Sequence, residues 1–225
     1  MELFETHFAS ISGNLYHDTT SDTYEMFSNR GIPRHLNYRT FQTLFQSMEG
    51  LKEPNILESG VAAYGTQSTY LFNEYVRKYG GRFWSVDIDQ AAIDKHVNNM
   101  CPATQLICDD SVHFFNSWVQ THQGQQAHVI YLDSWDLDMD NPDPAGLHGL
   151  NEYKALLPAI QKNTLLLIDD TPASPYWMDQ RGQVYLDMCV HYEKYKSMPG
   201  KGMYIIQEPK HAEMLIHNYQ VLYKF

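Results

Sequence analysis

The sequence predicts one α/β domain whose doubly wound, mostly parallel sheet is flanked by helices and ends in an antiparallel strand pair. Short apolar runs alternate with helical segments between residues 55 and 169, as in a parallel sheet covered on both faces. At 225 residues, with no internal repeat or low-complexity linker, the chain suits a single domain. We therefore expect one domain over residues 1–225, with 1–35 as an N-terminal lid or arm and 36–225 as the core.

The elements follow from hydrophobic spacing. A helix is expected over residues 38–49, because Tyr38, Phe41 and Leu44 recur at helical intervals. Strands are expected at 55–58, 82–87, 105–108, 128–133 and 164–169. Helices are expected between these strands. The first ends near residue 78, and the others cover 90–99, 111–120 and 149–161. Towards the C-terminus the pattern predicts a helix over 185–195, strands at 202–207 and 219–223, and a short helix over 210–217.

Composition narrows the functional class. Apolar residues make up 43% and charged residues 19%, an ordinary globular balance. The net charge of -11 and the lack of a dense Lys/Arg run disfavour a nucleic-acid partner. The 3 cysteines have no zinc or disulfide spacing. Neither a signal-peptide pattern nor an apolar run of ~20 residues is seen, so we expect a cytoplasmic protein with no membrane contact.

Acidic residues follow every expected strand of the parallel series. They are Glu58, Asp87, Asp109 and Asp110, Asp133, and Asp169 and Asp170. One such acid usually caps the next helix. A whole series at the carboxyl edge of a sheet instead places many carboxylates around one ligand cleft.

The loop after the first expected strand contains two glycines that would let the backbone approach a ligand. Gly60 and Gly65 lie in the segment 58–69, which is neither GxGxxG nor a P-loop. The gap from Gly60 to Asp87 also exceeds the ~20 residues of the dinucleotide fingerprint. An NAD-dependent oxidoreductase is therefore the less favoured alternative.

This loop resembles motif I of class I S-adenosylmethionine-dependent methyltransferases, an acid-x-Gly-x-x-x-Gly pattern, with one or two additional residues before Gly65. Ser-Val-Asp-Ile-Asp at 85–89 is similar to that family's second strand, and residues 108–111 to the segment that brackets the adenine. The resemblance covers about residues 36–170 and implies a Rossmann-like methyltransferase fold with S-adenosylmethionine as cofactor. Asp87 would accept hydrogen bonds from both ribose hydroxyls. The implied cofactor-binding residues are Glu58, Gly60, Ala62, Gly65, Ser68, Asp87, Ile88, Asp110, Ser111 and Asp133.

Within that class the chain looks similar to the metal-dependent O-methyltransferases of the catechol and macrolide-sugar type. The resemblance implies Mg²⁺ or another divalent cation bound by Asp133, Asp169 and Asp170. Oxygen ligands suit such an ion, which would orient a substrate hydroxyl and lower its pKa. The alternative is that these acids only form turns and caps, although three carboxylates packed without a cation would repel one another.

The implied activity is O-methylation of a hydroxyl on a small molecule or sugar, with Asp133 and His148 as catalytic residues. In related sugar methyltransferases a His closely follows the fourth-strand Asp, but here Asp136 takes that place and His148 comes after an acidic insertion. A surface His near a helix start is the alternative interpretation of His148. Acceptor contacts are expected from residues 30–35 and 172–178, and the aromatic-rich terminal segments could form a homo-oligomer interface. A non-catalytic nucleotide-binding module on the same fold stays open as an alternative.

Overall fold

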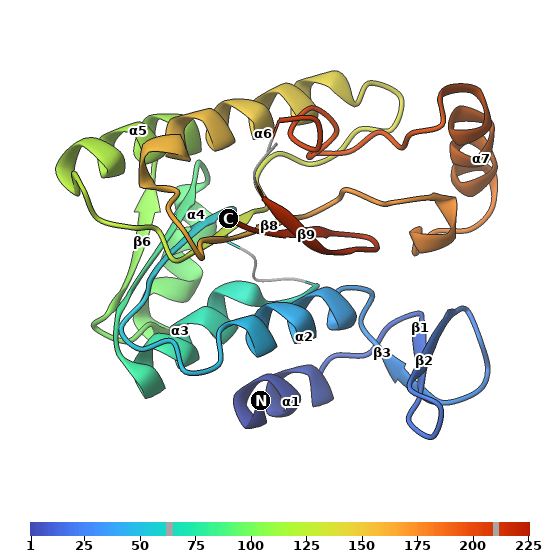
Figure 1. Cartoon of the computed structure of the whole chain (residues 1–225), viewed down its shortest axis with the longest axis horizontal. Coiled ribbons are helices and arrows are strands. Elements are labelled where there is room, and N and C mark those ends of the chain that lie inside the picture. Colours follow the sequence, from blue (N-terminus) through green and yellow to red (C-terminus); the bar gives the residue numbers. More distant parts are fainter. Residues whose placement is uncertain (62–64, 209–211) are drawn as a thin grey trace.

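The computed structural model describes residues 1–61, 65–208 and 212–225, and its centre is a seven-stranded sheet (Figure 1). The strand order is β6-β5-β4-β7-β8-β10-β9, in which β4 to β8 are parallel and β10 runs antiparallel to both β8 and β9. This confirms the predicted doubly wound sheet with a C-terminal antiparallel pair. The strands are β4 (Asn55–Ser59), β5 (Arg82–Asp87), β6 (Thr104–Cys108), β7 (Val129–Leu132), β8 (Leu165–Ile168), β9 (Glu213–His217) and β10 (Val221–Lys224).

The helices follow the strands closely in the predicted order. They are α2 (Tyr38–Ser47), α3 (Ser68–Tyr79), α4 (Gln90–His96), α5 (Ser111–Thr121), α6 (Asp143–Leu156) and α7 (Gln183–Tyr195). Short 3-10 turns cover Val97–Asn99, Leu157–Ala159 and Pro175–Trp177. Helix α6 begins at Asp143, earlier than the predicted residue 149, since Pro144 fits the first helical turn, where its missing N–H is not needed.

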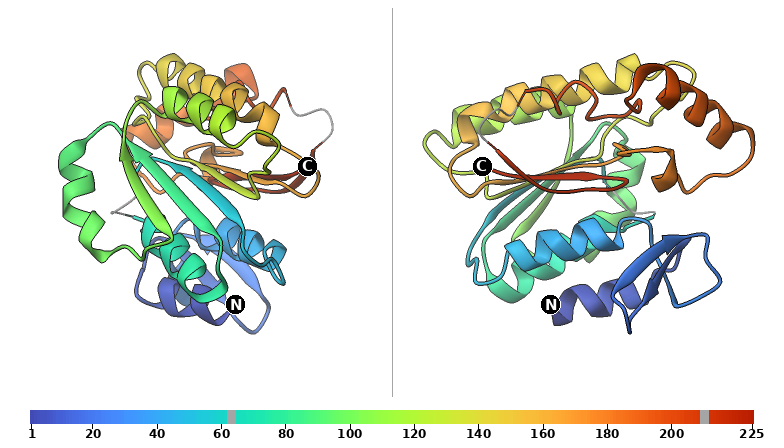
Figure 2. Two further views of the ribbon diagram at one scale, coloured as in Figure 1. Left: turned by 90° about the vertical axis from the view of Figure 1, so that its left-hand side faces the viewer. Right: turned by 45° about the vertical axis from the view of Figure 1, so that its right-hand side comes forward.

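Helices cover both faces of the large sheet (Figure 2). On one face α2 and α3 pack residues such as Phe41 and Phe72 against the strands, and on the other α5 and α6 contribute Phe115, Trp118 and Leu156. Both clusters contain fully or almost fully buried side chains. Burial on both faces explains why the parallel strands are near-continuous apolar runs.

The parallel register brings the strand ends to one edge. Ser59 on β4 lies opposite both Val86 and Leu132, and Leu132 lies opposite Ile168. From β4 the chain winds outward through β5 and β6, then returns to the other side of β4 with β7 and β8. Ligands of open α/β sheets bind at such a reversal, beyond the carboxyl ends of the strands. The predicted acids therefore collect where a ligand site is expected.

Two C-terminal predictions were wrong. Residues 202–207 form turns instead of a strand, because the Lys201 N–H donates to the Asp170 carbonyl (3.0 Å) and the Gly202 N–H to Thr171 Oγ1 (2.9 Å). These bonds hold the segment against the end of β8 instead of beside another strand. Residues 213–217 form β9 instead of a helix, since pairing with β10 outweighs the local pattern. Residues 210 and 211 of that expected helix lie outside the described residues.

The N-terminal segment has its own structure. Helix α1 (Glu2–Ala9) packs Phe4 and Phe8 into the core beside α2. Three short strands follow, β1 (Leu15–Asp18), β2 (Thr23–Met26) and β3 (Ile32–Arg34), in a separate antiparallel sheet of order β2-β1-β3. The sheet lies at the lower right of Figure 1. The role of this segment as a lid or arm stays a prediction.

Within the part of the chain that the structure describes, no helix has the length and apolar character that crossing a membrane requires.

Candidate functional site

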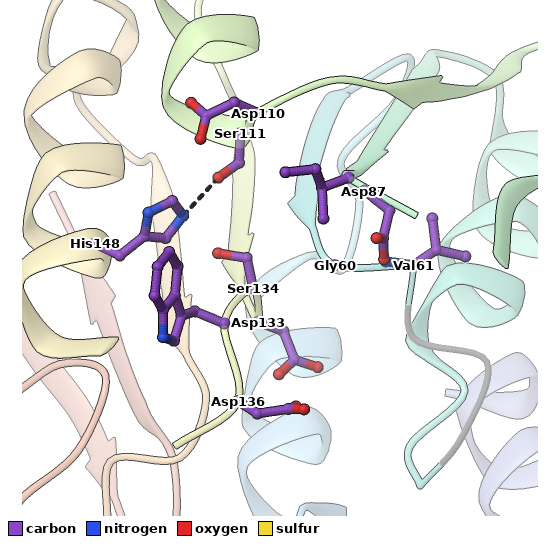
Figure 3. A pocket seen from close by; sticks show the side chains of 11 residues that line it. Gly60, Val61, Asp87, Asp110, Ser111, Asp133, Ser134, Asp136 and His148 are labelled. Carbon is purple, nitrogen blue, oxygen red and sulfur yellow. Dashed lines mark hydrogen bonds between the residues drawn. The ribbon is translucent and has the colours of Figure 1, made fainter. Parts of the chain in front are cut away.

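A cavity of about 600 Å³ opens at the carboxyl ends of the parallel strands (Figure 3). Six of the residues implied for the cofactor line it: Gly60, Asp87, Ile88, Asp110, Ser111 and Asp133. The other lining residues are Val61, Ser134, Trp135, Asp136 and His148. The implied residue Ala62 lies outside the described residues. The structure therefore brings six of the implied residues together around one cavity.

The floor of this pocket depends on a glycine. Gly60 has φ of +82°, and a Cβ there would lie 2.5 Å from the Asp133 carbonyl oxygen. Only glycine lets the ends of β4 and β7 approach so closely. The following N–H, of Val61, donates to Asp87 Oδ2 at 2.9 Å, and the Asp89 N–H donates to Oδ1 at 2.8 Å. Each Asp87 oxygen keeps further acceptor capacity for a ligand at the pocket.

Three implied cofactor residues do not line the pocket: Glu58, Gly65 and Ser68. Glu58 is fully buried and accepts hydrogen bonds from Ser68 Oγ (2.7 Å), Thr69 Oγ1 (2.6 Å) and Ser85 Oγ (2.6 Å). Burial raises the pKa of Glu58 to about 7, although the three hydroxyls act in the opposite direction. Glu58 thus connects the first turn of α3 to β4 and β5 beneath the loop.

His148 lies on the side of the pocket formed by the start of α5. Its Nε2 lies 2.9 Å from Ser111 Oγ, as the dashed line in Figure 3 marks, and 3.5 Å from Glu152 Oε1. The hydrogen bond with Glu152 raises the pKa of His148, against the effect of its burial. Its ring centre lies 5.1 Å from that of Trp135. His148 is therefore held by Ser111 and Glu152 beside the segment that the resemblance gives to adenine.

Asp110 combines two roles that the sequence left open. Its Oδ1 accepts a hydrogen bond from the His113 N–H at 2.9 Å, so it caps α5. The same residue lines the pocket. Capping and ligand binding are therefore compatible at this strand end.

The three predicted metal ligands, Asp133, Asp169 and Asp170, do converge, and we call them the carboxylate cluster. A lysine that the sequence analysis missed lies among them. Lys201 Nζ is 2.8 Å from Asp133 Oδ1 and 3.0 Å from Asp170 Oδ2, and its side chain is only 5% exposed. Burial alone would lower the pKa of Lys201, but the carboxylates of the cluster together hold it above the ordinary lysine value. The surrounding carboxylates therefore favour the ammonium form of Lys201.

Other donors complete the cluster. Asp169 accepts hydrogen bonds from Tyr131 Oη (2.9 Å) and Gln220 Nε2 (2.7 Å). Tyr131 also lies within 3.1 Å of Asp133 Oδ2, and Tyr219 Oη donates to Asp170 Oδ1 at 2.5 Å. Burial, with repulsion from Asp169, raises the pKa of Asp133 and of Asp170, and Lys201 opposes both shifts. The repulsion expected of three adjacent carboxylates is thus relieved by protein groups.

The cluster in this arrangement does not fit a divalent cation. Mg²⁺ requires oxygen ligands at ~2.0–2.1 Å in near-octahedral geometry. The Lys201 ammonium instead lies between the Asp133 and Asp170 oxygens that would have to supply them. Among the described residues, no three or more His, Cys, Asp or Glu side chains are placed to share one metal ion.

The segment that delivers Lys201 has a recognisable sequence, Gly200-Lys201-Gly202. A Cβ at Gly200 would lie 2.4 Å from the Asp170 carbonyl oxygen, and one at Gly202 would lie 2.8 Å from the Thr171 side chain. The flanking glycines therefore allow the lysine backbone to lie directly against the end of β8. Glycines on both sides of a lysine were the available signal, but nothing local in the sequence pairs them with Asp170.

Comparisons with known proteins support the fold. No protein-family model matches the sequence, and no curated protein does either. Among solved structures, the chain is similar to the MycE methyltransferase of the mycinamycin biosynthetic pathway, in complex with Mg and SAH, at 14% identity and a TM-score of 0.54. That match covers 84% of this chain but 49% of the MycE chain, so this chain spans about half of that protein's length. The calicheamicin methyltransferase CalS11 aligns at 13% identity and a TM-score of 0.49, with 83% of this chain and 77% of CalS11 covered.

Proposed function

We propose that this chain is an S-adenosylmethionine-dependent methyltransferase that methylates a hydroxyl of a small molecule or sugar. The charge of the pocket carries this proposal. Four carboxylates line it, those of Asp87, Asp110, Asp133 and Asp136, and its described lining contains no Lys or Arg. Such a pocket attracts a sulfonium cation and repels the pyrophosphate of NAD. The same observation disfavours the oxidoreductase alternative.

The lining residues favour one orientation of the proposed cofactor. The free acceptor capacity of Asp87 suits the ribose hydroxyls, beside the Gly60–Val61 backbone. The adenine then lies beside the start of α5, with Ile88 on one side and Trp135 and His148 on the other. This orientation directs the sulfonium towards Asp133. The MycE methyltransferase, whose solved structure holds SAH, shares the fold and supports the same cofactor here.

The chemistry is a displacement at the methyl carbon. The acceptor hydroxyl oxygen forms a bond to the methyl carbon, the carbon–sulfur bond breaks, and its electron pair goes to sulfur, while the hydroxyl proton leaves to a base. Alignment of oxygen, carbon and sulfur supplies most of the acceleration. Asp133 is our candidate to accept the hydroxyl hydrogen, because it lines the pocket at the end of β7. His148 is held by Ser111 and Glu152, which favours a positioning role on the adenine side. The metal assistance implied by the resemblance has no step in this scheme, because the cluster does not fit the ion.

The best candidate for the binding site of the methyl acceptor lies between the N-terminal sheet and the segment after β8. A cavity of about 370 Å³ is lined there by Met26, Phe27, Tyr176, Arg181 and Tyr185. Tyr219, which donates to Asp170, packs like Trp177 against the apolar cluster of Leu15, Met26 and Leu36, and so links this region to the carboxylate cluster. Aromatic walls of this kind suit a flat ring or a sugar face.

A methyl-transfer assay tests the function. Labelled S-adenosylmethionine is incubated with the protein and a panel of catechols, sugars and glycosides, and label in the acceptor is measured. Transfer to a hydroxyl supports the proposal. Cofactor binding without transfer to any member of the panel would favour the non-catalytic nucleotide-binding module, and transfer to carbon or nitrogen acceptors alone would contradict O-methylation.

A further inference from the structure

We propose that the Lys201 ammonium takes the place of a divalent cation in the carboxylate cluster, so that this chain binds no metal ion there and works without one. The observation is the position of Nζ between Asp133 Oδ1 and Asp170 Oδ2. The resemblance assigns these two residues, with Asp169, to an ion. In this chain a covalently attached cation contacts two of the three.

The lysine is fixed by its surroundings. Its N–H donates to the Asp170 carbonyl (3.0 Å), and the next N–H, of Gly202, donates to Thr171 Oγ1 (2.9 Å). Its carbonyl oxygen lies against α6, where a Cβ at Gly149 would approach it to 2.6 Å. Contacts on two sides therefore hold the backbone of a residue whose side chain is almost completely buried. Such a lysine cannot withdraw into solvent to admit an ion without moving the whole segment.

The charges also favour replacement over coexistence. A divalent ion at the cluster would have to share the Asp133 and Asp170 oxygens with the ammonium and would be repelled by it at short range. Asp169 is held by Gln220 and Asn37 at Oδ1 and by Tyr131 at Oδ2, so turning it towards an ion would break these hydrogen bonds. Gln220 is itself fully buried and bonded to Thr40, so this donor is held in place. The Lys201 ammonium therefore provides the positive charge of the cluster in place of a metal ion.

The ammonium also has capacity for a substrate. It has three N–H donors, and the Asp133 and Asp170 contacts use two of them. The third suits an acceptor hydroxyl oxygen beside Asp133, where a fixed positive charge would stabilise negative charge that develops on that oxygen. This role towards the acceptor rests on the proposed function, whereas the absence of metal binding does not.

The test is metal binding, measured by calorimetric titration of Mn²⁺ and of Mg²⁺ without cofactor or acceptor. Wild-type protein is expected to show no binding up to millimolar metal. Lys201→Met, which keeps the length of the side chain but removes its charge, is expected to gain at least about tenfold in Mn²⁺ affinity, because the carboxylates lose their cation. Lys201→Arg keeps the charge and is expected to gain nothing. Lys154→Met, at an exposed position on α6, is the matched control.

The outcomes separate clearly. Loss of the gained affinity in Lys201→Met with Asp170→Asn would locate the ion at the cluster and support the proposal. Wild-type metal binding that Asp170→Asn abolishes would overturn it, and this arm needs no lysine variant to fold. A folded Lys201→Met that binds no more metal than wild type would also overturn it. Because no methyl transfer is measured, failure here leaves the proposed function untouched, and failure of the transfer assay leaves this result standing.

Discussion

Two groups of carboxylates end the strands of the same sheet, and the structure treats them differently. Asp87 and Asp110 line an open pocket, and among the described residues they accept hydrogen bonds from nearby backbone N–H groups alone. Asp169 and Asp170 are bonded to side chains from distant parts of the chain, Gln220, Tyr219 and Lys201 among them. The first group can receive a cationic ligand, and the second has its partners in the protein. Asp133, on the strand between them, takes part in both.

The largest effect is expected when the lysine charge is removed from the carboxylate cluster. Lys201→Met leaves the partly buried Asp133 and Asp170 beside the buried Asp169 without a cation. Because Lys201 itself is almost completely buried, we expect the loss to approach the ~3–5 kcal/mol of unfolding free energy of a broken buried ion pair. Chemical denaturation in the presence of EDTA measures this cost. Exposed Lys154→Met is expected to change it by less than ~0.5 kcal/mol. Equal stability of the two variants would show that Lys201 does not neutralise the cluster.

The next largest effect is expected at Asp87, in the open pocket. Asp87→Asn removes the charge expected to accept the ribose hydroxyls, so affinity for S-adenosylmethionine is expected to fall by about 1.5–3 kcal/mol, or roughly ten- to a hundredfold. Calorimetry measures the affinity, and thermal unfolding checks that the fold is kept. Asp94→Asn, on the exposed side of α4, is the control. Unchanged affinity in Asp87→Asn would remove the central residue of the proposed cofactor site.

Features set by neighbouring residues could be predicted from the sequence, whereas contacts between residues far apart in the chain could not. The parallel strands and the acids at their ends follow from local apolar runs and Gly-containing loops, and six implied cofactor residues do line one pocket, whereas the order of the strands within the sheet comes from the structure alone. Glu58 does not line the pocket, and an acid at a strand end does not reveal that Ser68, Thr69 and Ser85 enclose it. Lys201 was missed because its segment resembled a strand, while its actual contacts are with Asp133 and Asp170. The local sequence does not show which distant residues a side chain will contact in the folded protein.

A third prediction concerns the support beneath the open pocket. The pKa of Glu58 is raised by burial from its ordinary 4.5 to about 7, so the neutral form is favoured in the folded state. The resulting stabilisation is fully present below pH 4.5 and is lost as the pH rises through about 7. Over that range wild type is expected to lose on the order of 1–3 kcal/mol relative to Glu58→Gln, which cannot ionise.

Denaturation curves at several pH values measure this difference, with exposed Glu49→Gln as the control that should follow wild type. If the unfolding free energies of wild type and Glu58→Gln changed with pH in parallel, the pKa of Glu58 would not be raised. The hydroxyls around the carboxyl would then stabilise its ionised form.

The smallest expected effect is at the rim of the pocket. Trp135 is 56% exposed and has φ of +61°, a conformation that is costly for a bulky residue. Trp135→Gly is therefore expected to change stability by less than ~1 kcal/mol. Loss of the ring beside His148 is expected to lower cofactor affinity severalfold, which calorimetry measures. Unaltered affinity would place the adenine away from this wall.

The most direct test of the account is calorimetric titration of S-adenosylmethionine into the wild-type protein in EDTA, with NAD as the parallel ligand. We predict micromolar binding of S-adenosylmethionine that added Mg²⁺ does not change, and no binding of NAD, because the open pocket is acidic and the cluster already holds its lysine. Binding of NAD in place of S-adenosylmethionine, or cofactor binding that appears only with Mg²⁺, would contradict it.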